Sequence, residues 1–228
     1  MRGLVLGTDS DDVVVHRLQN VEFVREIREG TMGTGEFPGS HEALLDVGRA
    51  SADSAASALS EVLMEEITID VTEVHVIPLD RIKEMYENTD HQVIVSLMKI
   101  KGDAGCDILL AFEEGEAREI AAVMAMEDSP DDMDPEMIDG ALTELGNIVM
   151  GCFISTLADS AGVGMLPAPP ELFAGHFEAI LDRFIRKQTR DADFSVIFKT
   201  SFKRGGQTVN GALIAFKSKE LIQTLTKV

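Results

Sequence analysis

The chain has few of the residues that mark disulfide frameworks or metal centres. Only two cysteines, Cys106 and Cys152, occur in 228 residues. Both lie in apolar runs far apart in sequence, so they predict two buried free thiols rather than a CxxC redox motif or a disulfide. The histidines show neither H-x3-H nor H-E-x-x-H spacing, so no metal site is predicted. They are His16, His41, His75, His91 and His176.

Positive charge is also scarce. Forty acidic residues against 20 basic ones give a formal net charge of -20. Nucleic acids and anionic membranes need clustered Lys or Arg, so neither is expected as a partner. An acidic surface is equally compatible with a solubility or high-salt adaptation, so the charge excludes more than it identifies.

Long hydrophobic runs are missing as well. The opening stretch "MRGLVLGTDSDDVVVH" is too short and too soon interrupted by acids for a signal peptide. No later run approaches the roughly 20 apolar residues of a membrane span. A cytoplasmic protein is therefore expected. Residues 1–38 end in the glycine-containing loop "TMGTGEFPG", which does not have G-x-G-x-x-G spacing and is interpreted as an extension or linker.

The rest of the chain, residues 39–228, predicts helices and strands in a repeating order. Hydrophobic periodicity predicts helices or strands for each segment, with Pro, Gly and acid clusters as breaks. Helices are expected at 41–64, 81–88, 115–128, 134–161, 174–188 and 219–227. Extended segments are expected at 67–79 and 163–173, and β-hairpins at 91–102 with 106–114 and at 193–202 with 209–218.

The order suggests an internal duplication. Sliding the sequence by 98 positions places Ala43 on Ala141, Leu44 on Leu142, Gly48 on Gly146, Ser57 on Ser155 and Leu59 on Leu157. In both copies an extended segment and a β-hairpin follow the long helix. A duplicated α/β unit is the better interpretation, with repeat one at about 41–127 and repeat two at about 134–228.

The second long helix carries an acid and an amide on its outer face. At about 100° per residue, the side of Glu144 also holds Asn147, Gly151, Ser155 and Ala158. The opposite, core-facing side holds Leu142, Leu145, Val149, Phe153 and Thr156. Gly146 and Gly151 each cost roughly 1 kcal/mol inside a helix, and close approach of another backbone is one reason to accept that cost.

These residues resemble the signature of the CheC, CheX and FliY phosphatases of chemotaxis. "ALTELGNIVMG", residues 141–151, followed by Pro170, matches E-x-x-N with a proline after 22 intervening residues. The resemblance covers roughly residues 40–228 and is strongest to CheC. It implies an α+β, sandwich-like fold, in which a tandem duplication packs long motif-bearing helices against an antiparallel β-sheet.

The first repeat departs from the signature. Asp46 stands for the acid, Arg49 for the amide and Thr72 for the proline. Because a guanidinium has only donors, Arg49 cannot accept a hydrogen bond from water as an amide oxygen can. The first site is therefore predicted to be catalytically dead, with Asp46 and Arg49 forming a surface ion pair instead. A smaller departure is Gly140, next to Asp139, where the family has Asp or Ser.

The resemblance implies a protein-aspartylphosphate phosphatase that acts on a CheY-type response regulator. Glu144 and Asn147 would be catalytic, and Gly151, Ser155, Ala158 and Pro170 would bind the partner. No cofactor is expected in this chain, because the receiver domain would supply Mg²⁺. The alternative is a non-catalytic adaptor that binds CheD or a receiver and acts by sequestration. A flagellar switch component like FliY would need a further motor-binding domain and ranks low.

Overall fold

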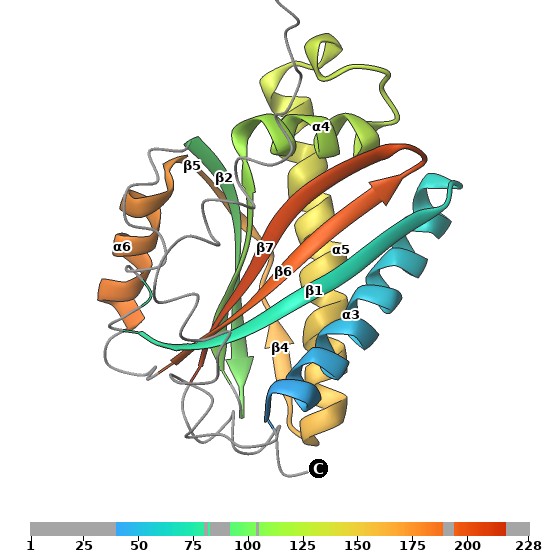
Figure 1. Ribbon diagram of the computed structural model, residues 1–228. Helices are drawn as coiled ribbons and strands as arrows, with labels where there is room; N and C mark the ends of the chain where they lie inside the picture. The colour runs from blue at the N-terminus through green and yellow to red at the C-terminus, as the bar shows by residue number, and fades with distance from the viewer. Residues whose placement is uncertain (1–39, 80–81, 83–91, 104, 189–193, 218–228) are drawn as a thin grey trace, which may run out of the picture.

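The computed structural model describes residues 40–79, 82, 92–103, 105–188 and 194–217 (Figure 1). The first half of the described chain contains α3 (Ser40–Leu63), β1 (Ile67–Pro78), β2 (Gln92–Gly102), β3 (Cys106–Glu113) and α4 (Glu114–Ala125). A 3-10 turn, η2 (Pro130–Asp132), leads to the second half. That half contains α5 (Pro135–Ala161), β4 (Met165–Pro167), β5 (Glu171–His176), α6 (Phe177–Gln188), β6 (Phe194–Arg204) and β7 (Gln207–Lys217).

The strands form one antiparallel sheet in the order β1-β6-β7-β3-β2-β4, with β5 also paired to β2. Each half supplies a central hairpin, β2–β3 or β6–β7, and the two hairpins meet where β3 pairs with β7. β1 of the first half pairs with β6 of the second, while β4 and β5 of the second half pair with β2 of the first. The halves thus exchange their outer strands, as expected for two copies of one unit that share a sheet.

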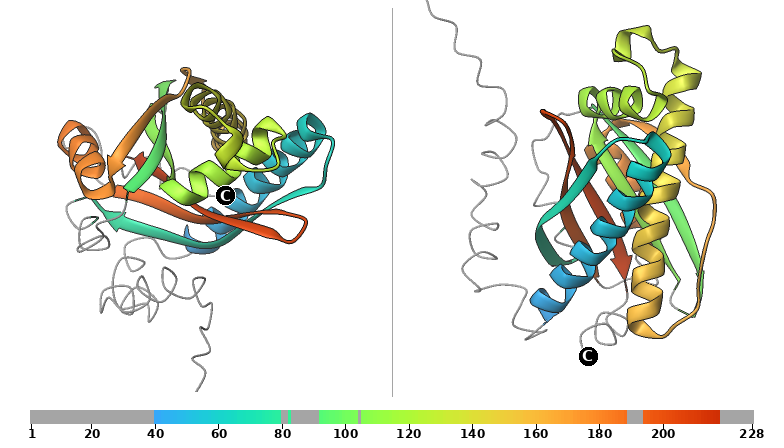
Figure 2. Two further views of the ribbon diagram at one scale, coloured as in Figure 1. Left: turned by 90° about the horizontal axis from the view of Figure 1, so that it is seen from above. Right: turned by 90° about the vertical axis from the view of Figure 1, so that its right-hand side faces the viewer.

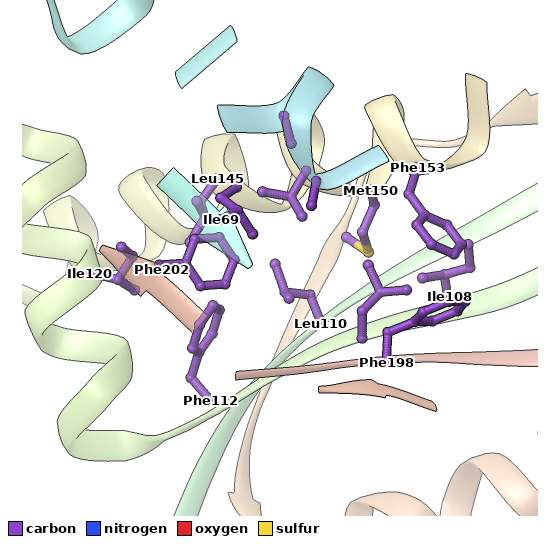
Figure 3. Packing of buried hydrophobic residues seen from close by; sticks show 14 of the residues in the cluster. Ile69, Ile108, Leu110, Phe112, Ile120, Leu145, Met150, Phe153, Phe198 and Phe202 are labelled. Carbon is purple, nitrogen blue, oxygen red and sulfur yellow. The ribbon is translucent and has the colours of Figure 1, made fainter. Parts of the chain in front are cut away.

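The two long helices lie on the same face of the sheet and α6 lies on the other, as the two orientations of Figure 2 show. Aromatic pairs fill the space under the long helices. Phe153 of α5 meets Phe198 of β6 edge to face with ring centroids 4.9 Å apart. Phe112 and Phe202 lie 5.4 Å apart nearer to α4 (Figure 3). This core fixes α5 against the middle of the sheet.

Most of the predicted elements are confirmed, and two boundaries are wrong by three residues. The helix expected to reach residue 128 ends at Ala125, because Met126 adopts the left-handed conformation. The helix expected from residue 174 begins at Phe177, because Ala174, Gly175 and His176 continue β5 and pair with β2. Three predicted segments lie outside the described residues: the extension at 1–38, the terminal helix at 219–227 and, apart from Ile82, the helix at 81–88. The proposed domain and repeat boundaries stay predictions.

α5 is apolar and long enough to cross a membrane by length and composition alone, which the sequence reading did not anticipate. Its apolarity has a structural explanation within the described chain, because one side of the helix packs against the sheet and α3. The buried residues on that side are Ile138, Leu142, Leu145, Gly146, Val149, Met150, Phe153, Ile154 and Leu157. A core helix meets the same compositional test as a membrane span.

Candidate functional site

α5 presents the acid and amide pair from a well-defined helix. The Asp134 side chain caps its start by accepting a hydrogen bond from the Met137 amide at 2.9 Å, and Pro135 occupies the first turn. The helix ends at Gly162, which adopts the left-handed conformation with φ 63°. The capping residues therefore determine where this 27-residue helix begins and ends. Its orientation about its own axis is determined by which side is buried.

Glu144 and Asn147 are both exposed, one turn apart on the outer side of α5. Ser155 on the same side is exposed, while Gly151 and Ala158 are partly exposed. The predicted outer face is therefore confirmed. The predicted core face is confirmed for the apolar positions, but Thr156 is only partly buried, and its hydroxyl donates to the Cys152 carbonyl at 3.0 Å.

Gly146, between the two polar residues, lies directly on strand β2. A Cβ at this position would be 2.3 Å from Ser96 Oγ and 3.1 Å from Ser96 Cβ. The close backbone approach expected at Gly146 therefore occurs within the chain rather than with a partner. Gly151 differs, because a Cβ there would have nothing within 4 Å. Of these two glycines, only Gly151 has open space beside the helix backbone.

Ser96 is a residue that the sequence reading missed. Its side chain is buried, and its Oγ has no hydrogen-bond partner among the described residues. A buried hydroxyl without a partner is unfavourable, so a small side chain at this position has another use. That use is the space it leaves for Gly146. The only signal in the sequence is one small polar residue inside the apolar strand "QVIVSLMKI".

The sheet brings Pro170 to the edge of the surface beside α5. Ser96, which supports Gly146, pairs across the sheet with Leu172 of β5, and Pro170 immediately precedes that strand. The short connection from β4 is held to β2 where the Ala168 amide donates to the Lys99 carbonyl at 2.9 Å. Pro170 is exposed to solvent in part. The signature residues therefore belong to neighbouring elements that share β2 as their support.

The corresponding face of α3 is built in the same way but carries different chemistry. Gly48 also packs closely, since a Cβ there would lie 2.8 Å from Phe198 Cδ1, compared with 2.3 Å from Ser96 Oγ at Gly146. Asp46 and Arg49 are exposed, as Glu144 and Asn147 are. The expected ion pair is wrong, because these two described side chains do not come within salt-bridge distance of each other. Both charges point into solvent instead.

The two thiols and the side chains that could bind a metal are the remaining reactive groups of the described chain. Neither cysteine is in a disulfide, as predicted, but only Cys106 is buried, whereas Cys152 is partly exposed beside the outer face of α5. Burial still raises the pKa of the Cys152 thiol. Within the described ranges, no three His, Cys, Asp or Glu side chains come together as a metal site.

The sequence is similar to chemotaxis phosphatases in two comparisons with known proteins. The family described as "Chemotaxis phosphatase CheX" matches residues 94–198, a range that contains Glu144, Asn147 and Pro170. The "CheY-P phosphatase CheC" of Bacillus subtilis (strain 168) is 23% identical over 164 residues, which cover 69% of this chain and 77% of that protein.

Solved structures show the same fold. FliY of Thermotoga maritima superposes with a TM-score of 0.66 at 18% identity, over 82% of this chain and 94% of that one. The FliM middle domain of H. pylori gives a TM-score of 0.57 at 9% identity, over 84% and 99% of the two chains. With the E-x-x-N helix, these matches lead to one conclusion: the chain is similar to the CheC, CheX and FliY proteins in sequence and shares their fold.

Proposed function

We propose that this protein stimulates hydrolysis of the phosphoaspartate of a CheY-type response regulator from the outer face of α5. The observation that carries the proposal is the exposure of Glu144 and Asn147 on one face of a helix held rigidly to the sheet, with Pro170 on the neighbouring edge. Support comes from the similar CheC protein, whose name gives it this activity.

The reaction makes few demands on this chain. Water attacks phosphorus in line, the bond from phosphorus to the aspartyl oxygen breaks, and the products are inorganic phosphate and a free aspartate, with the water proton passing to phosphate. Phosphoryl transfer depends mainly on positioning and charge stabilisation. In this proposal the receiver supplies Mg²⁺ and a lysine beside its phosphoaspartate. Asn147 supplies an amide, which can donate to and accept from the attacking water.

Glu144 has a different role. Its carboxylate lies one helical turn from Asn147 and would pair with the receiver's lysine, which fixes the register of the amide relative to phosphorus. Beyond this pair the outer face of α5 is low, because Gly151, Ser155 and Ala158 have short side chains or none. The open space at Gly151 lets a partner's surface approach the helix backbone. Docking along this track would bring Asn147 to the phosphoryl group.

The proposal is tested by following phosphate release from a purified, phosphorylated receiver with Mg²⁺ present. Asn147→Ala should abolish the stimulated rate while leaving binding to the phosphorylated receiver nearly unchanged. Glu144→Ala should weaken both. Arg49→Ala, at the equivalent exposed position of α3, is the matched control and should change neither. Unchanged turnover in the Asn147 variant would refute the mechanism.

The alternative is an adaptor that binds a receiver or CheD without catalysis. The observation in its favour is the first-repeat face, where Asp46 and Arg49 are exposed but offer no amide. An adaptor predicts receiver or CheD binding with no acceleration of dephosphorylation by the unmodified chain. The same assay separates the two functions, because the phosphatase must accelerate turnover before any substitution is made.

A further inference from the structure

A second surface, apart from the α5 face, combines exposed methionines with acidic side chains. Three large apolar side chains are unusually exposed where α3 and α4 end: Val62 by 56%, Met64 by 84% and Met126 by 64%. Between these helix ends and the β6–β7 hairpin runs a shallow cleft lined by apolar residues, among them Leu59, Leu63, Val123 and Met124. Figures 1 and 2 show the two helix ends and the hairpin tip next to one another.

Arg204 connects the two methionine-bearing turns. It lines the cleft and pairs with Glu65, the residue after Met64, at 3.0 Å from Nη2 to Oε1. The negative charge of Asp128, two residues after Met126, also raises the pKa of this guanidinium, after the larger effect of Glu65. Met64 and Met126 therefore flank one surface, which we call the methionine cleft.

Both methionines adopt a backbone conformation that favours glycine. Met64 has φ 52° and Met126 has φ 57°, each at the end of a helix. A residue with a Cβ is strained in the left-handed region, and helices commonly end on glycine there, as α5 does at Gly162. Two helices that border the cleft instead end on a flexible, exposed apolar side chain. The left-handed backbone at these two positions therefore favours glycine, so methionine is not explained by the stability of the fold.

The border of the cleft is acidic. Its two cations are already neutralised: Arg204 by Glu65, and Lys203 by Asp70 at 2.6 Å. Glu61 and Glu66 near the α3 end and Asp128 near the α4 end add negative charge. A basic partner is thus attracted, whereas a second copy of this chain, with its net charge of -20, or an anionic membrane is repelled.

We propose that the methionine cleft binds an amphipathic helix of another protein, with an apolar stripe and flanking Lys or Arg residues. Methionine side chains adapt to varied apolar surfaces, and helix-in-groove binding uses residues spaced three or four apart as anchors. The helix would lie between the ends of α3 and α4, with its basic side chains against Glu61, Glu66 and Asp128. This surface takes no part in the chemistry assigned to Asn147.

The test uses the full chain and a synthetic peptide of Leu and Lys, about five helical turns long, with its leucines on one face. A scrambled peptide of the same composition is the peptide control. Calorimetric titration should give saturable, one-to-one binding of the amphipathic peptide only. The variant Met64→Gly with Met126→Gly should bind it at least about tenfold more weakly, since removing central apolar anchors has effects of this size.

Measuring the melting temperature distinguishes a loss of peptide binding from a loss of folding. Because glycine suits the left-handed conformation, the double variant should melt no lower than the unmodified chain. Leu166→Ala removes another highly exposed apolar side chain, far along the sequence on β4, and should leave binding unchanged. Equal binding by all variants or by the scrambled peptide would overturn the proposal. Dimerisation lost in the double variant would do so as well, because the occupant would then be a second copy.

Discussion

A single methyl group at Gly146 tests whether the position of α5 determines activity. In Gly146→Ala the new Cβ would begin 2.3 Å from Ser96 Oγ, whereas ordinary contact starts at 3.4 Å. Rotation of the Ser96 hydroxyl would still leave the new Cβ 3.1 Å from Ser96 Cβ, so the helix or the strand must move by a few tenths of an ångström up to about 1 Å. A displacement of about 1 Å can reduce catalysis about a hundredfold. We therefore expect kcat for receiver dephosphorylation to fall by about that factor, with a smaller effect on binding.

Stability should change much less than the rate. Alanine is favoured over glycine in a helix interior by about 1 kcal/mol, while overpacking a core costs about 1 to 3 kcal/mol, so the net loss is about 0 to 2 kcal/mol. Gly48→Ala is the matched control, because its Cβ would meet the Phe198 ring at 2.8 and 2.9 Å. It should have a similar melting temperature to Gly146→Ala but retain full turnover.

A second substitution provides the rescue. Ser96→Gly removes both the hydroxyl and the Cβ that would obstruct the new methyl group, so Gly146→Ala combined with Ser96→Gly should regain much of the lost kcat. Met150 Cε, at 3.1 Å, is the end of a flexible side chain and can give way. Turnover by Gly146→Ala equal to that of the unmodified chain, or an equal loss in Gly48→Ala, would refute the reasoning.

Three further predictions concern titratable groups. Burial alone would raise the pKa of Glu73, but Lys199 at 2.9 Å and His75 at 3.0 Å hold it below the ordinary value of 4.5. The ionised Glu73 side chain therefore stabilises the fold fully above pH 4.5, and this stabilisation is lost as pH falls through the pKa of the folded state. The melting temperature of Glu73→Gln should accordingly fall less steeply at acidic pH than that of the unmodified chain. Burial raises the pKa of Glu116, so Glu116→Gln should raise the melting temperature more at pH 7 than at pH 4, and equal shifts would contradict this. Because burial raises its pKa, the Cys152 thiol should react with iodoacetamide more slowly than the thiol of a small peptide, and its rate should increase with pH. Mass spectrometry follows the labelling, and labelling at the peptide rate would contradict the raised pKa.

The outer face of α5 could be predicted from sequence because helical periodicity fixes which residues share a side. Once Leu142, Leu145 and Val149 are buried, Glu144 and Asn147 have to face outward. The repeat was visible for a similar reason, since duplicated helices keep their core positions in register. These features depend on spacing along one element, which the sequence contains in full.

Features that depend on two distant elements could not be predicted. The contact of Gly146 with Ser96 depends on the helix-to-sheet register, so the sequence alone could not show which backbone approaches this glycine. The Asp46 and Arg49 ion pair was expected from spacing alone, but exposed side chains that gain little from pairing can remain apart. The start of α6 was misplaced because pairing of Ala174 and His176 with β2 overrides their local preference.

The near-symmetry of the two halves allows the signature residues to be introduced into the first repeat, as a test of the prediction that Arg49 makes that position inactive. Gly48 and Gly146 both hold their helices, α3 and α5, close to the sheet, and residues 46 and 49 are exposed as residues 144 and 147 are. Thr72 lies at an irregularity between Val71 and Glu73 in the pairing of β1, a place where proline is tolerated. The backbone of the first site is therefore suited to the family's signature.

We expect Asp46→Glu, Arg49→Asn and Thr72→Pro together to create phosphatase activity in a chain whose own site is inactivated by Asn147→Ala. The physical reason is that an amide replaces a fixed cation, which repels the receiver's lysine and Mg²⁺ and cannot accept a hydrogen bond from the attacking water. Phosphate release from the phosphorylated receiver measures the gain, and the same chain with Arg49 retained is the control. A folded triple variant with no acceleration would show that the amide, acid and proline are insufficient. Activity in the control would show that the cation at Arg49 does not prevent catalysis at this position.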